Sequence, residues 1–372
     1  MIEPAQQQSS LSESGAKTSY EQWVESEGIS IIKTFFVEDI RSVKLEWWER
    51  KGGYGAFLQM EGAGQVNNCY ICEIPPGKSL KPQRHLFEET IYIVSGQGAT
   101  NVWNDENKKQ TFEWQTGSLF SPPLNAWHQH FNGSGSQPAR YLAVTTAPTM
   151  INLLHNLDFV FDNHFAFKDR FDGGHEYFSG QGVLHTGEYQ GFEFAGNVWE
   201  TNFVPDVRSF KLTDYRERGA GGKNIKFELS ENTTACHISE FPWGTYKKTH
   251  RHGPGAHVII LSGKGYSLIW PEGEPIRRYD WHEGSMVVPP EGWWHQHFNT
   301  GREPARYLAL RAFGSKKYRS MSKPYKGTVD RKKGGDQIEY EDEDLQVRRM
   351  FEEALATEGI SSRMESHYQK GR

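Results

Sequence analysis

Two groups of polar side chains in this 372-residue chain have the types and the spacing of metal ligands. They are Gln83, His85, Glu89 and His128 in the first group, and His250, His252 and His295 in the second. Residues i and i+2 of a strand point to one face, so each closely spaced pair can aim two side chains into one barrel. Imidazoles are good ligands for divalent transition metals, whereas glutamine is a poor one. The second group is therefore the stronger predicted metal site and the first is the weaker.

Two further histidines lie next to the second group in the sequence. His297 follows His295 by two residues, so strand alternation places both on the same face. We predict that His297 orients a substrate or acts as an acid or base, with a hydrogen-bonded core histidine as the alternative. His257 follows the turn-forming run Gly253-Pro254-Gly255, which can reset the face of a strand. We include it among the predicted catalytic residues, with a fourth ligand or a structural contact as alternatives.

The two groups occupy the same place in an internal repeat. The run Cys69-Tyr-Ile-Cys-Glu-Ile-Pro-Pro-Gly77 returns 167 residues later as Cys236-His-Ile-Ser-Glu-Phe-Pro-Trp-Gly244. The same offset relates His128 to His295, and no gap is needed from Cys69 to Asn132. In each copy, short apolar runs alternate with Gly and Pro, which is typical of strands in a barrel or sandwich. The duplication predicts two similar β domains.

Each copy resembles a cupin domain, and the residues that carry the resemblance are spread over two motifs. In the second copy they are Gly244, His250, His252, Gly263, Gly284, Pro290, Gly292, His295 and Asn299, and in the first they are Gly77, His85, Glu89, Gly96, Gly117, Pro123, His128 and Asn132. The resemblance covers roughly residues 65–145 and 232–312. It implies an all-β fold of two tandem cupin barrels, also called double-stranded β-helix or jelly-roll barrels. Gln83 and Ala256 depart from the family pattern, because His and Glu are usual there.

The repeat and the composition of its flanks divide the chain into five predicted parts. They are an N-terminal arm (1–50), cupin domain 1 (51–148), an irregular linker (149–195), cupin domain 2 (196–320) and a C-terminal tail (321–372). Within the tail, Asp344 can cap a helix that Gly359 ends.

The resemblance also implies a class of reaction. Three-histidine cupins without the glutamate are similar to iron dioxygenases of the gentisate and salicylate 1,2-dioxygenase types. We therefore expect Fe(II), with Mn(II), Ni(II) or Zn(II) as alternatives, and a small chelating anionic substrate, such as an aromatic hydroxy acid, that reacts with dioxygen in the second barrel. Gentisate-type enzymes carry their working site in the first cupin domain. This chain departs from that pattern, because its three-histidine group lies in the second. The alternatives are a manganese enzyme of the oxalate decarboxylase kind, an isomerase or lyase, and a non-catalytic binding protein.

Composition narrows the remaining possibilities. The net charge of −5 and the lack of a basic stripe argue against a nucleic-acid partner. Cys69 and Cys72 lie on a predicted strand that points them to opposite faces, so we expect reduced thiols. Because the first 19 residues are polar and no apolar run reaches ~20 residues, we expect no signal peptide, no membrane contact and a cytoplasmic location. The resemblance implies a homo-oligomer.

Overall fold

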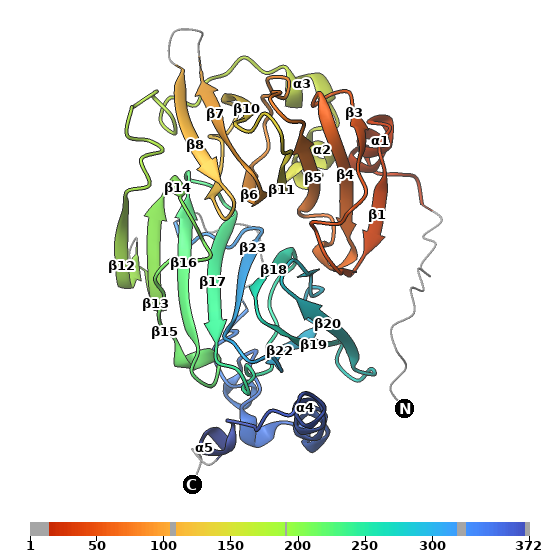
Figure 1. Ribbon diagram of the computed structural model, residues 1–372, viewed down its shortest axis with the longest axis vertical. Helices are drawn as coiled ribbons and strands as arrows, with labels where there is room; N and C mark the ends of the chain where they lie inside the picture. Colours follow the sequence, from red (N-terminus) through yellow and green to blue (C-terminus); the bar gives the residue numbers. More distant parts are fainter. Residues whose placement is uncertain (1–14, 105–108, 190–191, 318–324, 369–372) are drawn as a thin grey trace.

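The computed structural model describes residues 15–104, 109–189, 192–317 and 325–368, and most of its regular structure is strand. Two β-barrels, one from each half of the repeat, stack on one another, and the C-terminal helix lies beyond the second barrel (Figure 1). This confirms the predicted all-β architecture of two tandem jelly-roll barrels.

The first barrel is made of an eight-stranded and a three-stranded sheet, with the orders β1-β4-β5-β11-β6-β9-β14 (β3 pairs with β4) and β10-β7-β8. Its strands are β1 (Ile31–Thr34), β3 (Glu46–Trp48), β4 (Gly53–Met60), β5 (Asn68–Ile74), β6 (Glu89–Ser95), β7 (Gln97–Trp103), β8 (Gln110–Gln115), β9 (Leu119–Phe120), β10 (Trp127–Asn132) and β11 (Ala139–Thr145).

The second barrel repeats this plan with a nine-stranded and a three-stranded sheet, with the orders β12-β13-β16-β17-β23-β18-β21-β2 (β15 pairs with β16) and β20-β19-β22. Its strands are β12 (Gly182–Tyr189), β13 (Phe192–Thr201), β15 (Thr213–Asp214), β16 (Lys223–Leu229), β17 (Ala235–Phe241), β18 (Ala256–Ser262), β19 (Lys264–Trp270), β20 (Arg277–His282), β21 (Met286–Val287), β22 (Trp294–Asn299) and β23 (Ala305–Arg311). Strands β12 and β13 begin inside the predicted irregular linker, because a hairpin there extends the large sheet.

Each half of the chain lends a short strand to the other half. Strand β2 (Phe36–Val37) precedes the first barrel but pairs with β21 of the second. Strand β14 (Phe203–Val204) precedes the second barrel but pairs with β9 of the first. The two strands are equivalent in the repeat, so the exchange is reciprocal. It fixes the two barrels against each other through main-chain hydrogen bonds.

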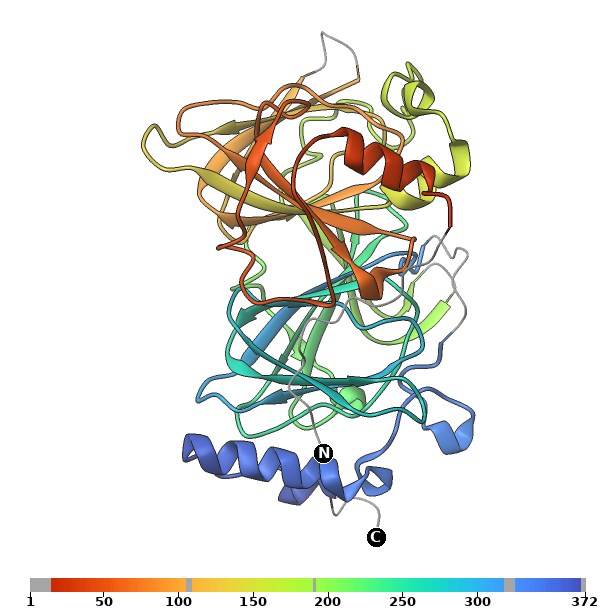
Figure 2. The ribbon, with the colours of Figure 1, turned by 90° about the vertical axis from the view of Figure 1, so that its right-hand side faces the viewer.

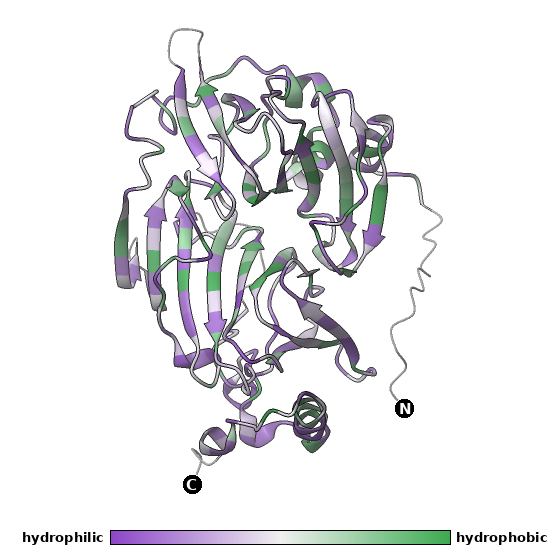
Figure 3. Ribbon diagram, in the orientation of Figure 1, coloured by the Kyte–Doolittle hydropathy of each residue, from purple (hydrophilic) through white to green (hydrophobic). Residues whose placement is uncertain are grey.

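The two large sheets face each other and share a core. This inter-barrel core contains Leu58, Ile71, Leu119 and Leu142 from the first barrel and Phe227, Ile238, Ile259 and Leu308 from the second. Hydropathy changes from residue to residue along β13, β16 and β17 (Figure 3). In the large sheets, alternate residues point into the barrel interiors. On β5, for example, Cys69 joins the inter-barrel core and Cys72 the interior of the first barrel. This confirms that the two thiols face opposite ways.

Helices flank both barrels: in Figure 2 the red and yellow helices lie on the right-hand side of the first barrel, and the blue helix lies below the second. They are α1 (Ser19–Ser26), α2 (Ala147–Leu154) and α3 (Leu157–Phe161) at the first barrel, and α4 (Leu345–Glu358) and α5 (Glu365–Tyr368) at the second. Trp23 of α1 packs edge-on against Phe57 inside the first barrel. The Asp344 side chain accepts a hydrogen bond at the start of α4, and Gly359 ends the helix in the left-handed region, as predicted. Among the described residues, no helix combines the length and the apolar composition that crossing a membrane requires.

Glu88, just before β6, joins the barrels through a buried carboxylate. Its oxygens accept hydrogen bonds from the backbone N–H groups of Thr233 (2.6 Å) and Thr234 (3.0 Å) and from both threonine hydroxyls (3.0 and 2.9 Å). Hydrogen bonds to a charged acceptor are stronger than neutral ones, and their loss leaves buried donors unpaired.

Replacing Glu88 with Ala should therefore lower the free energy of unfolding by about 2–4 kcal/mol. Urea unfolding followed by circular dichroism measures this change. The exposed Glu113 of β8 offers a matched control, and Glu113→Ala should change stability by no more than about 0.5 kcal/mol. Equal stability of the two variants would contradict the role of Glu88.

Candidate metal centres

The second barrel brings the three predicted histidines together. His250 and His252 precede β18, and His295 lies on β22. The backbones of His250 and His295 exchange two hydrogen bonds of 3.0 and 2.9 Å, which places their side chains next to each other. A ring nitrogen of each of the three histidines lies within 4.8 Å of those of the other two. The group is thus compact enough to surround one ion.

Hydrogen bonds fix which nitrogen of each ring is free. The Nδ1 atoms donate to main-chain oxygens of near neighbours: His250 to Lys248 (3.0 Å), His252 to Gly253 (2.8 Å) and His295 to Trp293 (3.1 Å). Each Nε2 therefore carries the lone pair. Burial lowers the pKa of all three rings, that of His295 to about 3, so they are neutral near pH 7. Neutral imidazoles with Nε2 lone pairs at close range fit a divalent metal ion.

The first barrel holds a second group, made of His85, Glu89 and His128. The Nε2 atoms of His85 and His128 lie 3.4 and 3.3 Å from Oε2 of Glu89. Their Nδ1 atoms donate to the main-chain oxygens of Phe87 and Ala126. Both Nε2 atoms and both carboxylate oxygens are buried without a hydrogen-bond partner. Since buried polar atoms rarely lack a partner, this set also fits a divalent metal ion.

A buried ammonium accompanies this first group. Nζ of Lys51 lies 3.7 Å from Oε1 of Glu89 and donates to the hydroxyl of Tyr70 (2.9 Å). Burial alone would raise the pKa of Glu89, but Lys51 and His128 hold it at about 2. The carboxylate is therefore charged near pH 7, and its charge is balanced within the protein.

Gln83 takes the position in the first barrel that His250 takes in the second. Its backbone pairs with that of His128, as the backbone of His250 pairs with that of His295. Its side-chain amide, however, donates to the main-chain oxygens of Arg50 and Pro82, each at 3.1 Å. The amide nitrogen is thus held by the loop, and Oε1 is the atom that Gln83 could offer to a metal. The compact group of imidazole and carboxylate ligands is His85, Glu89 and His128.

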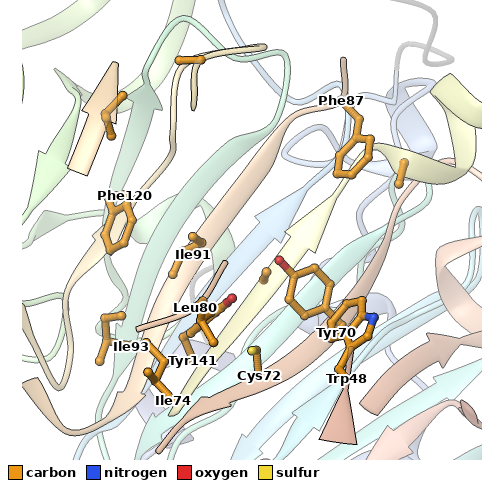
Figure 4. Close-up of a cluster of buried hydrophobic side chains, with 14 of the residues drawn as sticks. Trp48, Tyr70, Cys72, Ile74, Leu80, Phe87, Ile91, Ile93, Phe120 and Tyr141 are labelled. Atoms are coloured by element: carbon orange, nitrogen blue, oxygen red, sulfur yellow. The ribbon is translucent and has the colours of Figure 1, made fainter. Parts of the chain in front are cut away.

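The two barrels differ in their interiors. The first is filled by large side chains that include Tyr70, Ile91, Phe120 and Tyr141 (Figure 4). The second contains a cavity of about 320 Å³ whose wall includes His250, His252, His295 and His297. Three repeat positions on this wall carry smaller side chains than in the first barrel, namely His237 for Tyr70, Ala256 for Glu89 and Val258 for Ile91. These replacements provide room for a small molecule beside the three histidines.

His297 faces this cavity from the same strand face as His295. Its Nδ1 lies 2.8 Å from the hydroxyl of Ser267, which accepts a hydrogen bond from the indole of Trp281 (3.1 Å). The arrangement that uses every donor has the Ser267 hydroxyl donating to Nδ1, so Nε2 of His297 carries the proton. Burial lowers the pKa of His297 well below its usual value. The ring is therefore a neutral donor at the cavity wall.

His257 lies elsewhere. It is fully buried on β18, between Ala256 and Val258, which both line the cavity. Strand alternation therefore points it to the other face, which β18 shares with Ile259 of the inter-barrel core. The preceding turn does not reset the face. His257 is not placed to bind the metal or to act on a molecule in this cavity, contrary to the expectation from its sequence position.

Three basic residues of the cavity wall escaped the sequence analysis: Lys247, Arg218 and Arg311. Lys247 is 3% exposed, donates to the hydroxyl of Ser239 (2.5 Å) and lies over the rings of Phe241 and Tyr307. Burial, followed by repulsion from Arg218, lowers its pKa from 10.5 to about 7. Arg218 and Arg311 also line the cavity, and each has a buried guanidinium nitrogen without a hydrogen-bond partner. A comparison of the two repeat copies could have identified two of them, because Lys247 and Arg311 stand where the first copy has the uncharged Leu80 and Thr145.

Comparison with known proteins places two cupin domains on this frame. The cupin domain family matches residues 70–145 and 237–311. Over 66 residues the chain is 35% identical to a gentisate 1,2-dioxygenase from Ralstonia sp, which covers 18% of this chain and 17% of that protein. Over 132 residues it is 26% identical to a putative germin-like protein 9-2 from Oryza sativa subsp. japonica, covering 35% and 58%. The chain thus spans less than two thirds of either relative.

A solved structure of Lactobacillus farciminis oxalate decarboxylase, in complex with formate, is also similar. It shares 15% sequence identity with this chain, at a TM-score of 0.48, over 74% of this chain and 85% of that one.

The metal centres can be tested one at a time. Since loss of a direct ligand costs more than loss of an outer partner, His252→Ala should weaken metal binding in the second barrel by more than about 100-fold and leave the first unchanged. His128→Ala should do the reverse. Metal content per chain after equilibrium dialysis, measured by mass spectrometry, separates the two. His282→Ala, at an exposed histidine, is the control. Full metal content in His252→Ala would contradict the assignment.

Lys247 leads to a prediction about pH. Its folded pKa of about 7 lies below the usual 10.5, so the unfolded chain binds more protons between these values. The stability of the metal-free protein should therefore rise with pH across this window, and Lys247→Met should remove that rise. Relative to this variant, the wild type should gain up to about 4 kcal/mol between pH 7 and 10 in urea unfolding. Lys223→Met, at an exposed lysine, should follow the wild type, and parallel profiles for all three proteins would refute the shift.

Proposed function

The chain belongs to the cupins, with one cupin domain in each half, and from this premise we propose that it is a metal-dependent enzyme whose reaction takes place in the second barrel. One observation carries the proposal. The second barrel combines three neutral histidines, whose Nε2 lone pairs are free, with a cavity large enough for a small molecule. The first barrel has a comparable ligand group, but large side chains surround it.

The reaction we propose is that of a non-haem iron dioxygenase. Three neutral ligands leave the full charge of a divalent ion uncompensated, which favours a substrate that chelates it through anionic oxygens. Fe(II), when bound, would supply Lewis acidity and electrons for dioxygen. The local identity with a gentisate 1,2-dioxygenase supports this class of reaction. Fe(II) and an aromatic hydroxy acid are accordingly the metal and the substrate that we propose to test first.

The residues of the chain have separable roles in this proposal. His250, His252 and His295 hold the metal. His297, with its proton on Nε2 and Ser267 behind it, donates a hydrogen bond into the cavity and can orient the substrate there. Lys247, whose pKa is about 7, can either accept a proton from the substrate or give one to it near pH 7. Arg218 and Arg311 attract an anion to the cavity.

A second candidate is a redox-neutral manganese enzyme that decarboxylates or isomerises a small carboxylate. The observation that favours it is Lys247, because a buried amine with a pKa near 7 is suited to protonating a carbanion. The two candidates differ in their need for oxygen. A protein that holds such ligands without turnover would be a binding protein.

Oxygen uptake tests the proposal. The Fe(II)-loaded chain should consume oxygen with at least one member of a panel of gentisate, salicylate, β-diketones and small thiols. His252→Ala should be at least 100-fold slower, and His282→Ala should match the wild type. No oxygen consumption with the whole panel would refute the dioxygenase. Release of CO₂ from oxalate by the Mn(II)-loaded chain, without net oxygen consumption, would establish the second candidate instead.

A further inference from the structure

The two barrels place a cation at the same point of their frame. The main-chain oxygen of Lys51 accepts a hydrogen bond from the N–H of Lys81 (2.8 Å), and that of Arg218 accepts one from Lys248 (2.9 Å). Lys81 and Lys248 are 167 residues apart, as are Lys51 and Arg218, so the two cations are equivalent in the repeat. Each of them enters its barrel beside the candidate metal ligands.

The surroundings of these two cations differ. In the first barrel, the carboxylate of Glu89 faces Lys51 at 3.7 Å. In the second barrel, the equivalent residue is Ala256, which lines the cavity together with Arg218. Within the part of the chain that the structure describes, Arg218, Lys247 and Arg311 form no ion pair within 4.0 Å. The carboxylate of Glu228 also lines this cavity, but it accepts hydrogen bonds from the Ser315 hydroxyl and the main-chain N–H of Lys316. The second barrel therefore keeps the cation but has lost the anion that balances it.

Two more replacements between the barrels add basic side chains to the second barrel. Lys247 stands where the first barrel has Leu80, and Arg311 stands where it has Thr145. Arg311 is the direct cross-strand partner of Ala256, as Thr145 is of Glu89. A buried nitrogen of Arg311 and one of Arg218 lack a hydrogen-bond partner. Positive charge thus gathers around the place that a carboxylate occupies in the other barrel.

We propose that the substrate of the second barrel carries two separate anionic groups, one that faces the three histidines and one carboxylate that lies against Arg218 and Arg311, on the side of the cavity where Ala256 replaces Glu89. This inference rests on the proposed function, since it takes the second barrel as the substrate site. Guanidinium groups suit a carboxylate because they present paired donors in one plane. The substrate class is therefore a small dicarboxylate, or a chelating acid with a second carboxylate.

Calorimetric titration of the full chain loaded with Zn(II), which performs no oxygen chemistry, tests the inference. The probes are malonate and succinate against propionate and butyrate, which have the same carbon counts and one carboxylate fewer. At constant ionic strength, the better dicarboxylate should bind at least 10-fold more tightly than its monocarboxylate. Arg218→Gln and Arg311→Gln should each remove at least 10-fold of this affinity. Arg216→Gln, two residues away and 79% exposed at its side chain, should remain within 2-fold of the wild type.

Ala256→Glu gives an independent readout. It returns the carboxylate that the first barrel has, so it should lower dicarboxylate affinity at least 10-fold while the Zn(II) content stays at the wild-type value. Retained metal shows that the barrel is folded. Equal affinity for mono- and dicarboxylates, no measurable binding of either dicarboxylate, or full affinity in the arginine variants or Ala256→Glu would overturn the inference.

The outcome for the proposed function can be separated from this result. Oxygen uptake with a substrate of one carboxylate, at a KM that Arg218→Gln leaves unchanged, would overturn the dianion inference and support the dioxygenase. Tight dicarboxylate binding without oxygen uptake by the iron-loaded chain would support the dianion inference and refute the dioxygenase.

Discussion

The strands of the two large sheets have two buried faces each, and the rest of the structure depends on this constraint. Along β18, Ile259 belongs to the inter-barrel core, while Ala256 and Val258 line the cavity. Because side chains alternate, a shift of one residue in register would send the apolar set into the cavity and His257 among the ligands. The packing between the barrels and the geometry of the site are therefore fixed by the same register, and neither can change alone.

The exchanged strands add to this constraint. Strands β2 and β14 each complete the sheet of the other barrel, so each barrel depends on a segment that precedes its partner. Glu88 reinforces the junction through Thr233 and Thr234. Helix α1 packs Trp23 against Phe57 of the first barrel, and α4 packs Phe351 against Tyr246 and Phe298 of the second, which nevertheless retains a cavity. One frame thus yields a filled barrel and an open one.

Sequence reasoning reached the fold and the three histidines because both depend on local rules. A repeat of 167 residues predicts two like barrels, and the spacing of His250 and His252 predicts one shared face. It misplaced His257, since the direction of a side chain after a turn depends on tertiary contacts. It also gave no sign that the amide nitrogen of Gln83 donates to the oxygens of Arg50 and Pro82. It missed Arg218, Lys247 and Arg311, because a lone basic residue in a sequence has the pattern of a solvated one until the fold buries it.

The charges explain why the two barrels, similar in frame, differ in what they can hold. Burying a cation costs several kcal/mol unless an anion accompanies it. In the first barrel, Lys51 and Glu89 supply both charges, so the buried cation there needs no anion from outside. In the second barrel, Ala256 removes the anion while Lys247 and Arg311 add cations, and a divalent metal at the histidines would raise the positive charge further. A bound anion would stabilise such a cavity. The free energy that the unpaired, buried Arg218 costs in the empty cavity is recovered when the anion binds, and this strengthens the binding.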